Sequence, residues 1–150
     1  MSRYHKVLMA SVLITMASAS VARAEEKHIQ RKDLPPAVEK TVAEQSKGAT
    51  IKGFAKEVEN GKKLYEVELS VNGHGKDVSI DQQGNVVEVE EEVTITALPP
   101  EVKNGLTKAA GKGTIGKVES LTKNGKLVAY EAVVKTGTKS SEVQVGPDGQ

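Results

Sequence analysis

The 150-residue chain has 27% charged residues, a formal net charge of +1 at pH 7 and no cysteine. Such a nearly neutral chain, without clustered basic residues, lacks the electrostatic footprint of a nucleic-acid-binding protein. Without cysteine it forms no disulfide framework, so its stability must come from the burial of side chains. Aromatic residues make up only 3% of the chain, which predicts a small and largely aliphatic core.

The beginning of the chain has the three-part layout of a secretory signal peptide. Two basic residues precede an apolar run at residues 7–17, and the small residues that follow end on Ala22 and Ala24. This layout predicts cleavage between Ala24 and Glu25. The alternative is a membrane anchor, but the apolar run is shorter than the roughly 20 residues that a spanning helix needs. We therefore expect a signal peptide at 1–24, export to the periplasm or beyond, and no stable membrane anchor after cleavage.

The rest of the chain repeats one pattern twice. Leu34-Pro35-Pro36 recurs 64 residues later as Leu98-Pro99-Pro100, and both copies continue to an Asn-Gly-Lys motif. Between residues 34–62 and 98–126, 9 of 29 positions are identical, where ordinary composition would give about two. A fixed period indicates one supersecondary unit built twice. The expected organisation is a flexible lead-in at 25–33, a first repeat at 34–96 and a second repeat at 97–150.

Each repeat predicts one helix followed by a meander of strands. Pro35 and Pro99 fit the first helical turn, where the missing N–H group has no partner to lose. Gly48 and Gly111 fit the ends of these helices. The two Asn-Gly pairs predict tight hairpin turns between strands. The predicted fold class is therefore α+β, with two tandem units, each one helix packed on an antiparallel three- to four-stranded meander sheet.

The two repeats differ at their ends. The turn at residues 146–150 is the counterpart of the turn at residues 81–85. In the first repeat a strand follows this turn, at residues 85–93, but the second repeat has no counterpart of that strand. We therefore expect the final strand of the second repeat to be missing, either because the gene ends early, because the sequence is truncated, or because the second unit has one strand fewer. The sheet edge left behind would carry unpaired backbone groups, which is a liability for pairing with other chains.

The order of these motifs resembles a known family. The motifs that carry the resemblance are Leu-Pro-Pro, Asn-Gly-Lys, Tyr65-Glu66-Val67 and the turn Asp81–Asn85. Through them the chain resembles a PepSY-like domain and the exported proteins grouped as beta-lactamase-inhibitor-like. The resemblance covers nearly all of the chain after the leader, as two tandem copies. It implies a helix packed on an antiparallel four-stranded sheet in each unit, with an open face for a partner. It also implies peptidase inhibition or protein binding outside the cytoplasm.

Glutamates fill the outward side of the predicted strands. In residues 65–71 and 87–92, apolar residues alternate with polar ones, and alternate residues of a strand share a face. The outward face is therefore expected to be acidic and to bind an unidentified extracytoplasmic protein or peptide. The alternative is a solvated face that only keeps the protein soluble. The residues of this predicted surface are Glu66, Glu68, Glu88, Glu90, Glu92, Glu131 and Glu142, with Lys135 among them.

The sequence predicts no metal site, cofactor site or catalytic centre. Glu88, Glu90 and Glu92 are about 7 Å apart along one strand, so their side chains splay, whereas calcium needs six to eight converging oxygen atoms. His28 and His74 have no partner at ligand spacing. The chain has no Gly-x-Ser-x-Gly or His-Glu-x-x-His motif. We therefore expect a protein that is not an enzyme.

Together these patterns predict an exported protein- or peptide-binding module, with peptidase modulation or inhibition as one form of that function. No nucleic acid is expected among its partners. The alternative is a structural or stress protein of the envelope that binds a cation or small ligand weakly through the acidic face. A partner lost on charge reversal of the face would favour the first function. A melting temperature raised by calcium and not by magnesium would favour the second.

Overall fold

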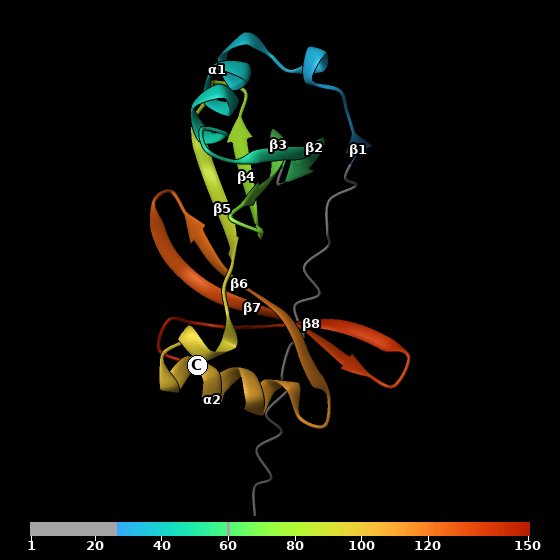
Figure 1. Ribbon diagram of the computed structural model, residues 1–150, viewed down its shortest axis with the longest axis vertical. Coiled ribbons are helices and arrows are strands. Elements are labelled where there is room, and N and C mark those ends of the chain that lie inside the picture. Colours follow the sequence, from blue (N-terminus) through green and yellow to red (C-terminus); the bar gives the residue numbers. More distant parts are fainter. Residues whose placement is uncertain (1–26, 60) are drawn as a thin grey trace, which may run out of the picture.

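The computed structural model describes residues 27–59 and 61–150 and consists of one antiparallel sheet with two α-helices (Figure 1). Two 3₁₀ turns, η1 and η2, precede the helices. The strands are β1 (Lys27–His28), β2 (Thr50–Glu59), β3 (Lys62–Val71), β4 (His74–Asp81), β5 (Val86–Glu92), β6 (Thr114–Lys123), β7 (Lys126–Thr136) and β8 (Lys139–Val145). The helices are η1 (Arg31–Asp33), α1 (Pro36–Gln45), η2 (Ile95–Ala97) and α2 (Pro100–Ala110).

The eight strands follow one another in the sheet in chain order, from β1 to β8, and every neighbouring pair is antiparallel. The expected α+β class is therefore confirmed. The two repeats do not form separate sheets, because β5 of the first repeat pairs with β6 of the second along Glu88–Glu92. Hydrogen bonding thus gives one continuous sheet and does not divide it into units of three to four strands.

Each helix packs on its own hydrophobic core. In Figure 1 the two helices lie at opposite ends of the long axis of the molecule. The small core of mainly aliphatic residues that the composition predicts is present twice. The buried residues of the first core are Leu34, Val38, Val42, Tyr65, Val67, Leu69, Val78 and Ile80, and those of the second are Leu98, Val102, Leu106, Val118, Ala132 and Val145.

Strand register places both cores on the same face of the sheet. Val89 of β5 packs against the first core, and Glu91, two residues later, faces the same side. Glu91 pairs with Ser120, and Ser120 pairs with Tyr130, which packs against the second core. Within the described residues, the opposite face of the sheet therefore carries no helix.

The local signals in the sequence correspond to real backbone features. The β6–β7 turn has φ of 49° at Asn124 and 77° at Gly125, the two positive values that a type I′ hairpin needs. Asn60 of the matching turn lies outside the described residues. The helices begin at Pro36 and Pro100, one residue after the expected positions. Gly111 caps α2 with φ of 57°, as its position predicted.

The segment before the first repeat differs from the expected flexible lead-in. Residues 27–28 pair with β2 as strand β1, and Ile29 donates a backbone hydrogen bond to Phe54. The expected cleavage residues Ala22, Ala24 and Glu25, with the rest of the leader, lie outside the described residues. None of the described helices is long and apolar enough to cross a membrane.

Both repeats seat a turn on the first turns of their helix. The turn after β4 places Gly84 against Ala37 of α1, and Thr41 Oγ1 donates a 2.6 Å hydrogen bond to the Gly84 carbonyl. The turn after β8 places Gly149 against Glu101 and Gly105 of α2. Within the described residues β8 is the last strand, and Gly146 N donates a 2.8 Å bond to the Gln150 carbonyl.

Candidate functional site

The helix-free face of the sheet carries carboxylates on six neighbouring strands, β3–β8. Cross-strand partners share a face, so the pairs of the ladder show which side chains belong to it. Glu68 pairs with Asp77 and Asp77 with Glu90, while further along Glu92 pairs with Glu119 and Glu119 with Glu131. We call this surface the acidic face; its carboxylates on β3–β8 are Glu66, Glu68, Asp77, Glu88, Glu90, Glu92, Glu119, Glu131 and Glu142.

All seven glutamates proposed from the sequence lie on this face, together with two acids that the sequence reasoning missed. Asp77 precedes the buried Val78, and Glu119 follows the buried Val118. Alternation around these two valines could have assigned both acids to the face. What it could not show is that they lie opposite or diagonal to Glu90, because that depends on the register of β4, β5 and β6.

The centre of the acidic face is a cluster of Asp77, Glu90 and Glu119. One carboxylate oxygen from each lies within 4.8 Å of the others, and all three residues are half-buried. Burial raises the pKa of Glu90 to about 7, and the charges of Glu119, Glu131, Glu88 and Asp77 add to the effect. Since both burial and like charge disfavour the ionised form, the centre of the face repels further negative charge.

Two lysines and a histidine lie beside carboxylates of the acidic face, including Glu119 of the central cluster. Lys123 Nζ lies 2.7 Å from Glu88 Oε2, and this hydrogen bond raises the pKa of Lys123. Lys117 Nζ lies 2.8 Å from Glu119 Oε1. His28 Nδ1, from β1, lies 3.9 Å from Glu68 Oε1 and forms an ion pair only when protonated.

Other carboxylates of the face are held by hydrogen bonds. Gly75 N donates a 3.0 Å bond to Glu92 Oε2, and Gln144 Nε2 donates a 2.6 Å bond to Glu131 Oε1. Burial and the charge of Glu142 raise the pKa of Glu131. The crowding of negative charge therefore extends from the centre of the face to β8.

This arrangement can attract cationic groups. The sequence predicted that glutamates spaced along one strand would splay, and no metal site was expected. In the structure, acids converge across strands instead, and Asp77, Glu90 and Glu119 are close enough to share a divalent cation or a single ammonium group. Calcium would need further oxygen ligands, from water or from a partner, because three carboxylates seldom complete its shell.

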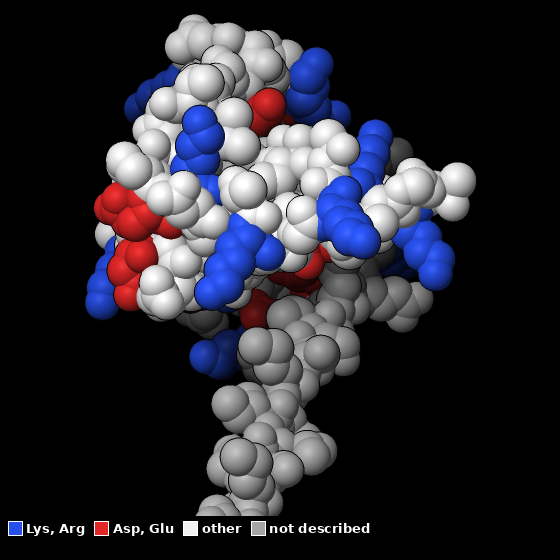
Figure 2. Space-filling model, turned by 90° about the horizontal axis from the view of Figure 1, so that it is seen from below, with Lys and Arg blue, Asp and Glu red and all other residues white. Residues whose placement is uncertain are grey.

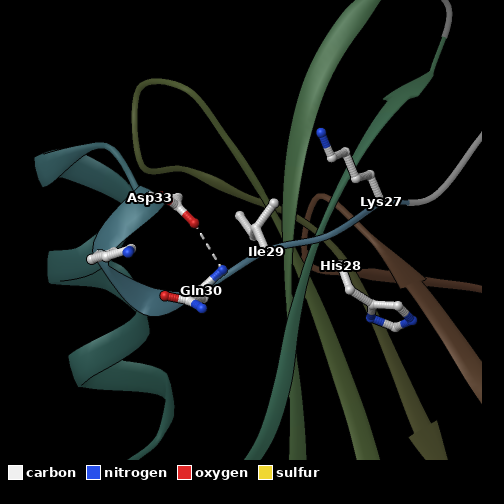
Figure 3. Close-up of a pocket in the computed structure, with 6 residues that line it drawn as sticks. Lys27, His28, Ile29, Gln30 and Asp33 are labelled. Atoms are coloured by element: carbon white, nitrogen blue, oxygen red, sulfur yellow. Dashed lines mark hydrogen bonds between the residues drawn. The ribbon is translucent and has the colours of Figure 1, made fainter.

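Two hollows lie away from this centre. One, of about 630 Å³, lies beside β1 and η1, where Figure 3 shows Gln30 N bonded to Asp33 Oδ2 at 3.0 Å. The other, of about 650 Å³, lies among the hairpin tips and reaches Glu88 and Lys123. Asp81 at its rim accepts hydrogen bonds from the amides of Gln83 and Asn85. Neither hollow is lined by the cluster of Asp77, Glu90 and Glu119, so we place the candidate site on the acidic face.

The end of the molecule that carries α2 has a different charge. In Figure 2, which views the molecule from below, blue side chains are scattered over a mostly white surface, and red ones are visible mainly at the left and below the centre. Lys103, Lys108 and Lys112 are exposed on or just after α2. Exposed lysines therefore lie at this end of the molecule.

Known structures share this fold at low sequence identity. A BLIP-like protein from Bacteroides fragilis has a TM-score of 0.57 at 20% identity, covering 78% of this chain and 82% of its own. A DUF2874 family protein from Bacteroides ovatus has a TM-score of 0.60 at 20% identity, covering 79% and 84%. A structure from Bacteroides eggerthii is described as one of the "putative periplasmic proteins". Its TM-score is 0.63 at 16% identity, and the match covers 78% of this chain and 84% of its own.

No curated protein matches this chain significantly. A family model does match it, twice, at residues 21–88 and 65–145. The two matches together span most of the chain and fit the internal repeat and the two helix-covered cores. The chain therefore belongs to the PepSY-like family, described as "Putative beta-lactamase-inhibitor-like, PepSY-like".

Proposed function

We propose that this chain is an exported, non-enzymatic module that binds a basic protein or peptide through the acidic face. The observation that carries the proposal is the row of carboxylates across β3–β8 on the face that bears no helix among the described residues. A lysine- or arginine-bearing partner would place positive charge where Glu90 now has a pKa of about 7. Electrostatic complementarity of this kind favours specificity and a fast association rate.

Export is supported by the leader-like residues 1–24 and by the fold shared with the Bacteroides eggerthii structure described as periplasmic. The family description, with its reference to beta-lactamase inhibitors, makes an extracytoplasmic enzyme one class of partner. We include peptidases in that class, so the proposed module would act by occupying or modulating an enzyme and would perform no chemistry itself.

Charge reversal on the acidic face tests this function. We expect the double variant Glu68→Lys/Glu90→Lys to lose at least about tenfold in affinity for a lysine-rich peptide at low salt. The matched control is Glu44→Lys/Glu101→Lys, which makes the same change in net charge on the exposed sides of α1 and α2. Fluorescence anisotropy with the labelled peptide measures both. Equal loss in the two variants would mean that net charge, and not the acidic face, attracts the peptide.

The same pair of variants identifies natural partners. Immobilised protein starting at Glu25 is exposed to an extracytoplasmic extract of the source organism beside each double variant. A protein retained by the wild type and the helix-side control, but released by Glu68→Lys/Glu90→Lys, is a partner of the acidic face. A peptidase among such proteins would be assayed for inhibition.

The central cluster favours one alternative function, weak binding of a divalent cation. Oxygen atoms of Asp77, Glu90 and Glu119 lie within 4.8 Å of one another. If the protein has this function, millimolar calcium raises its melting temperature and magnesium does not, because a ligand that binds only the folded state stabilises that state. The variant Asp77→Asn abolishes the shift caused by calcium. A calcium shift that survives in Asp77→Asn would place the cation elsewhere.

A further inference from the structure

Strand β8 forms one end of the described sheet, at the opposite end from β1 (Figure 1). It is mostly exposed over its seven residues, Lys139–Val145. In the first repeat the equivalent strand is β4, because Val78 and Ile80 recur as Val143 and Val145. The outer side of β4 is covered by β5, which pairs with it from Lys76 to Ile80. The position that β5 occupies in the first repeat therefore has a counterpart beside β8.

The two cores differ at this position. Val86 and Val89 of β5 pack against the first core, and Val78 is fully buried there at 0% exposure. The described residues give the second core no counterpart of Val86 and Val89, and Val143 is only half-buried. An added strand with apolar residues on the helix-covered side would complete the burial of Val143.

The charge beside β8 favours a basic strand. The acidic-face side of an added strand would lie next to Glu142, with Glu131 one strand further. A strand with glutamates at these positions, like β5 itself, would place like charges opposite each other, which is destabilising. Lysine or arginine opposite Glu142 would avoid this repulsion between like charges.

Backbone geometry shows which groups of β8 would bond to the added strand. The β7–β8 hairpin has a two-residue turn, Gly137–Thr138, with φ of 62° at Gly137. Such a turn is closed by a hydrogen-bonded pair, here Thr136 and Lys139, and bonded pairs then alternate along the ladder. Gln144 therefore lies at a position whose backbone groups point away from β7.

We propose that the outer edge of β8 binds an extended segment of a partner protein, in which apolar and basic residues alternate, by adding it to the sheet as a further strand. This goes beyond the proposed function, because it assigns a basic segment with an apolar side to the edge of the sheet and not to the centre of the acidic face. Strand addition derives affinity from main-chain hydrogen bonds and specificity from alternate side chains.

A synthetic peptide tests the proposal: residues 85–93 of this chain with every glutamate replaced by lysine. We expect it to bind the wild-type protein, and Gln144→Pro to weaken binding about tenfold because proline removes the outward N–H group. The matched control Gln144→Ala loses the same side chain but keeps the N–H, so its affinity stays within about twofold. Urea unfolding confirms that each variant is folded.

Charge exchange gives a second test that leaves the backbone intact. Glu142→Lys should weaken the lysine peptide about fivefold and bind the native glutamate peptide more tightly than the wild type does. The variant Glu68→Lys/Glu90→Lys should leave this binding within about threefold at 150 mM salt, since Glu90 is three strand spacings, about 14 Å, from β8.

The two proposals fail in different ways. No binding of the lysine peptide, or equal affinity of Gln144→Pro and Gln144→Ala, would overturn strand addition at β8. Binding that is lost in Glu68→Lys/Glu90→Lys but kept in Gln144→Pro would also overturn it, and would place the peptide on the acidic face as first proposed. Binding that depends on Gln144 and Glu142 alone supports the β8 edge.

Discussion

Replacing Glu90 with glutamine is expected to stabilise the protein at pH 8 and to leave its stability nearly unchanged at pH 4.5. In the wild type, burial and four neighbouring carboxylates raise the pKa of Glu90 from 4.5 to about 7. Ionising Glu90 at pH 8 therefore costs free energy that glutamine avoids. A shift of this size would correspond to about 3 kcal/mol for a fully buried group. Because Glu90 is only half-buried, solvent screening reduces the expected gain to about 1–2 kcal/mol.

The sign follows from proton linkage. Below pH 4.5 the carboxyl group of Glu90 is protonated in both the folded and the unfolded chain, so it contributes no pH dependence. Between pH 4.5 and 7 the folded state holds the proton more tightly than the unfolded state, and the free energy of unfolding falls as pH rises. Above pH 7 both states are ionised and the full penalty remains, so the benefit of glutamine is largest there.

Urea unfolding at pH 4.5 and pH 8 measures this difference. The control is Glu91→Gln, which removes the same charge from the same strand on the helix-covered side, where Glu91 is exposed. We expect the control to change the free energy of unfolding by less than about 0.5 kcal/mol at either pH. A gain at pH 8 that is equal in both variants would attribute the effect to net charge and would contradict the crowding of acids at Glu90.

Alternation along the strands was enough to predict which glutamates share a face, because side chains in a strand follow a period of two. It predicted nothing about distances between strands. Glu90 lies close to Asp77 and Glu119 only because β4, β5 and β6 are neighbours in a particular register. The β5–β6 pairing joins two repeats across a helix, and no local motif specifies it. The expectation of splayed carboxylates was therefore derived from one strand, while the cluster is built from three.

Turn chemistry gave the most reliable local predictions. The turn at Asn124-Gly125 has two positive φ values, which few residue pairs adopt. These two residues were therefore enough to predict the hairpin. Lys27 and His28 offered no such signal. They join the sheet because β2 presents an edge to them, a tertiary effect that overrides the weak strand propensity of a lysine and a histidine.

In both repeats a turn packs against the helix of its own unit. The sequence repeats the residues of this contact, but no local motif predicts the contact itself. Gly84 and Gly149 are equivalent positions, with φ of 86° and 79°. A Cβ added at Gly84 would lie 2.7 Å from the Ala37 carbonyl oxygen, and one at Gly149 would meet the carbonyl of Glu101. In α1, Thr41 donates a hydrogen bond to the Gly84 carbonyl. The equivalent residue in α2 is Gly105, which has no side chain, so the Gly149 carbonyl can approach the helix closely. Both units thus use glycine where the turn contacts the helix backbone.

Gly84→Ala is therefore expected to destabilise the protein by about 2–4 kcal/mol, because a positive φ and a contact with the helix backbone act together. The matched control is Gly48→Ala, where φ is 75° but nothing lies within 4 Å of an added Cβ. The control should cost only the conformational penalty, about 1 kcal/mol. Urea unfolding measures the loss of unfolding free energy in each variant, and the difference between the two losses is the contribution of the contact between Gly84 and Ala37. Equal costs would mean that the turn after β4 moves away from α1 without loss, and that the contact between Gly84 and Ala37 contributes nothing to the fold.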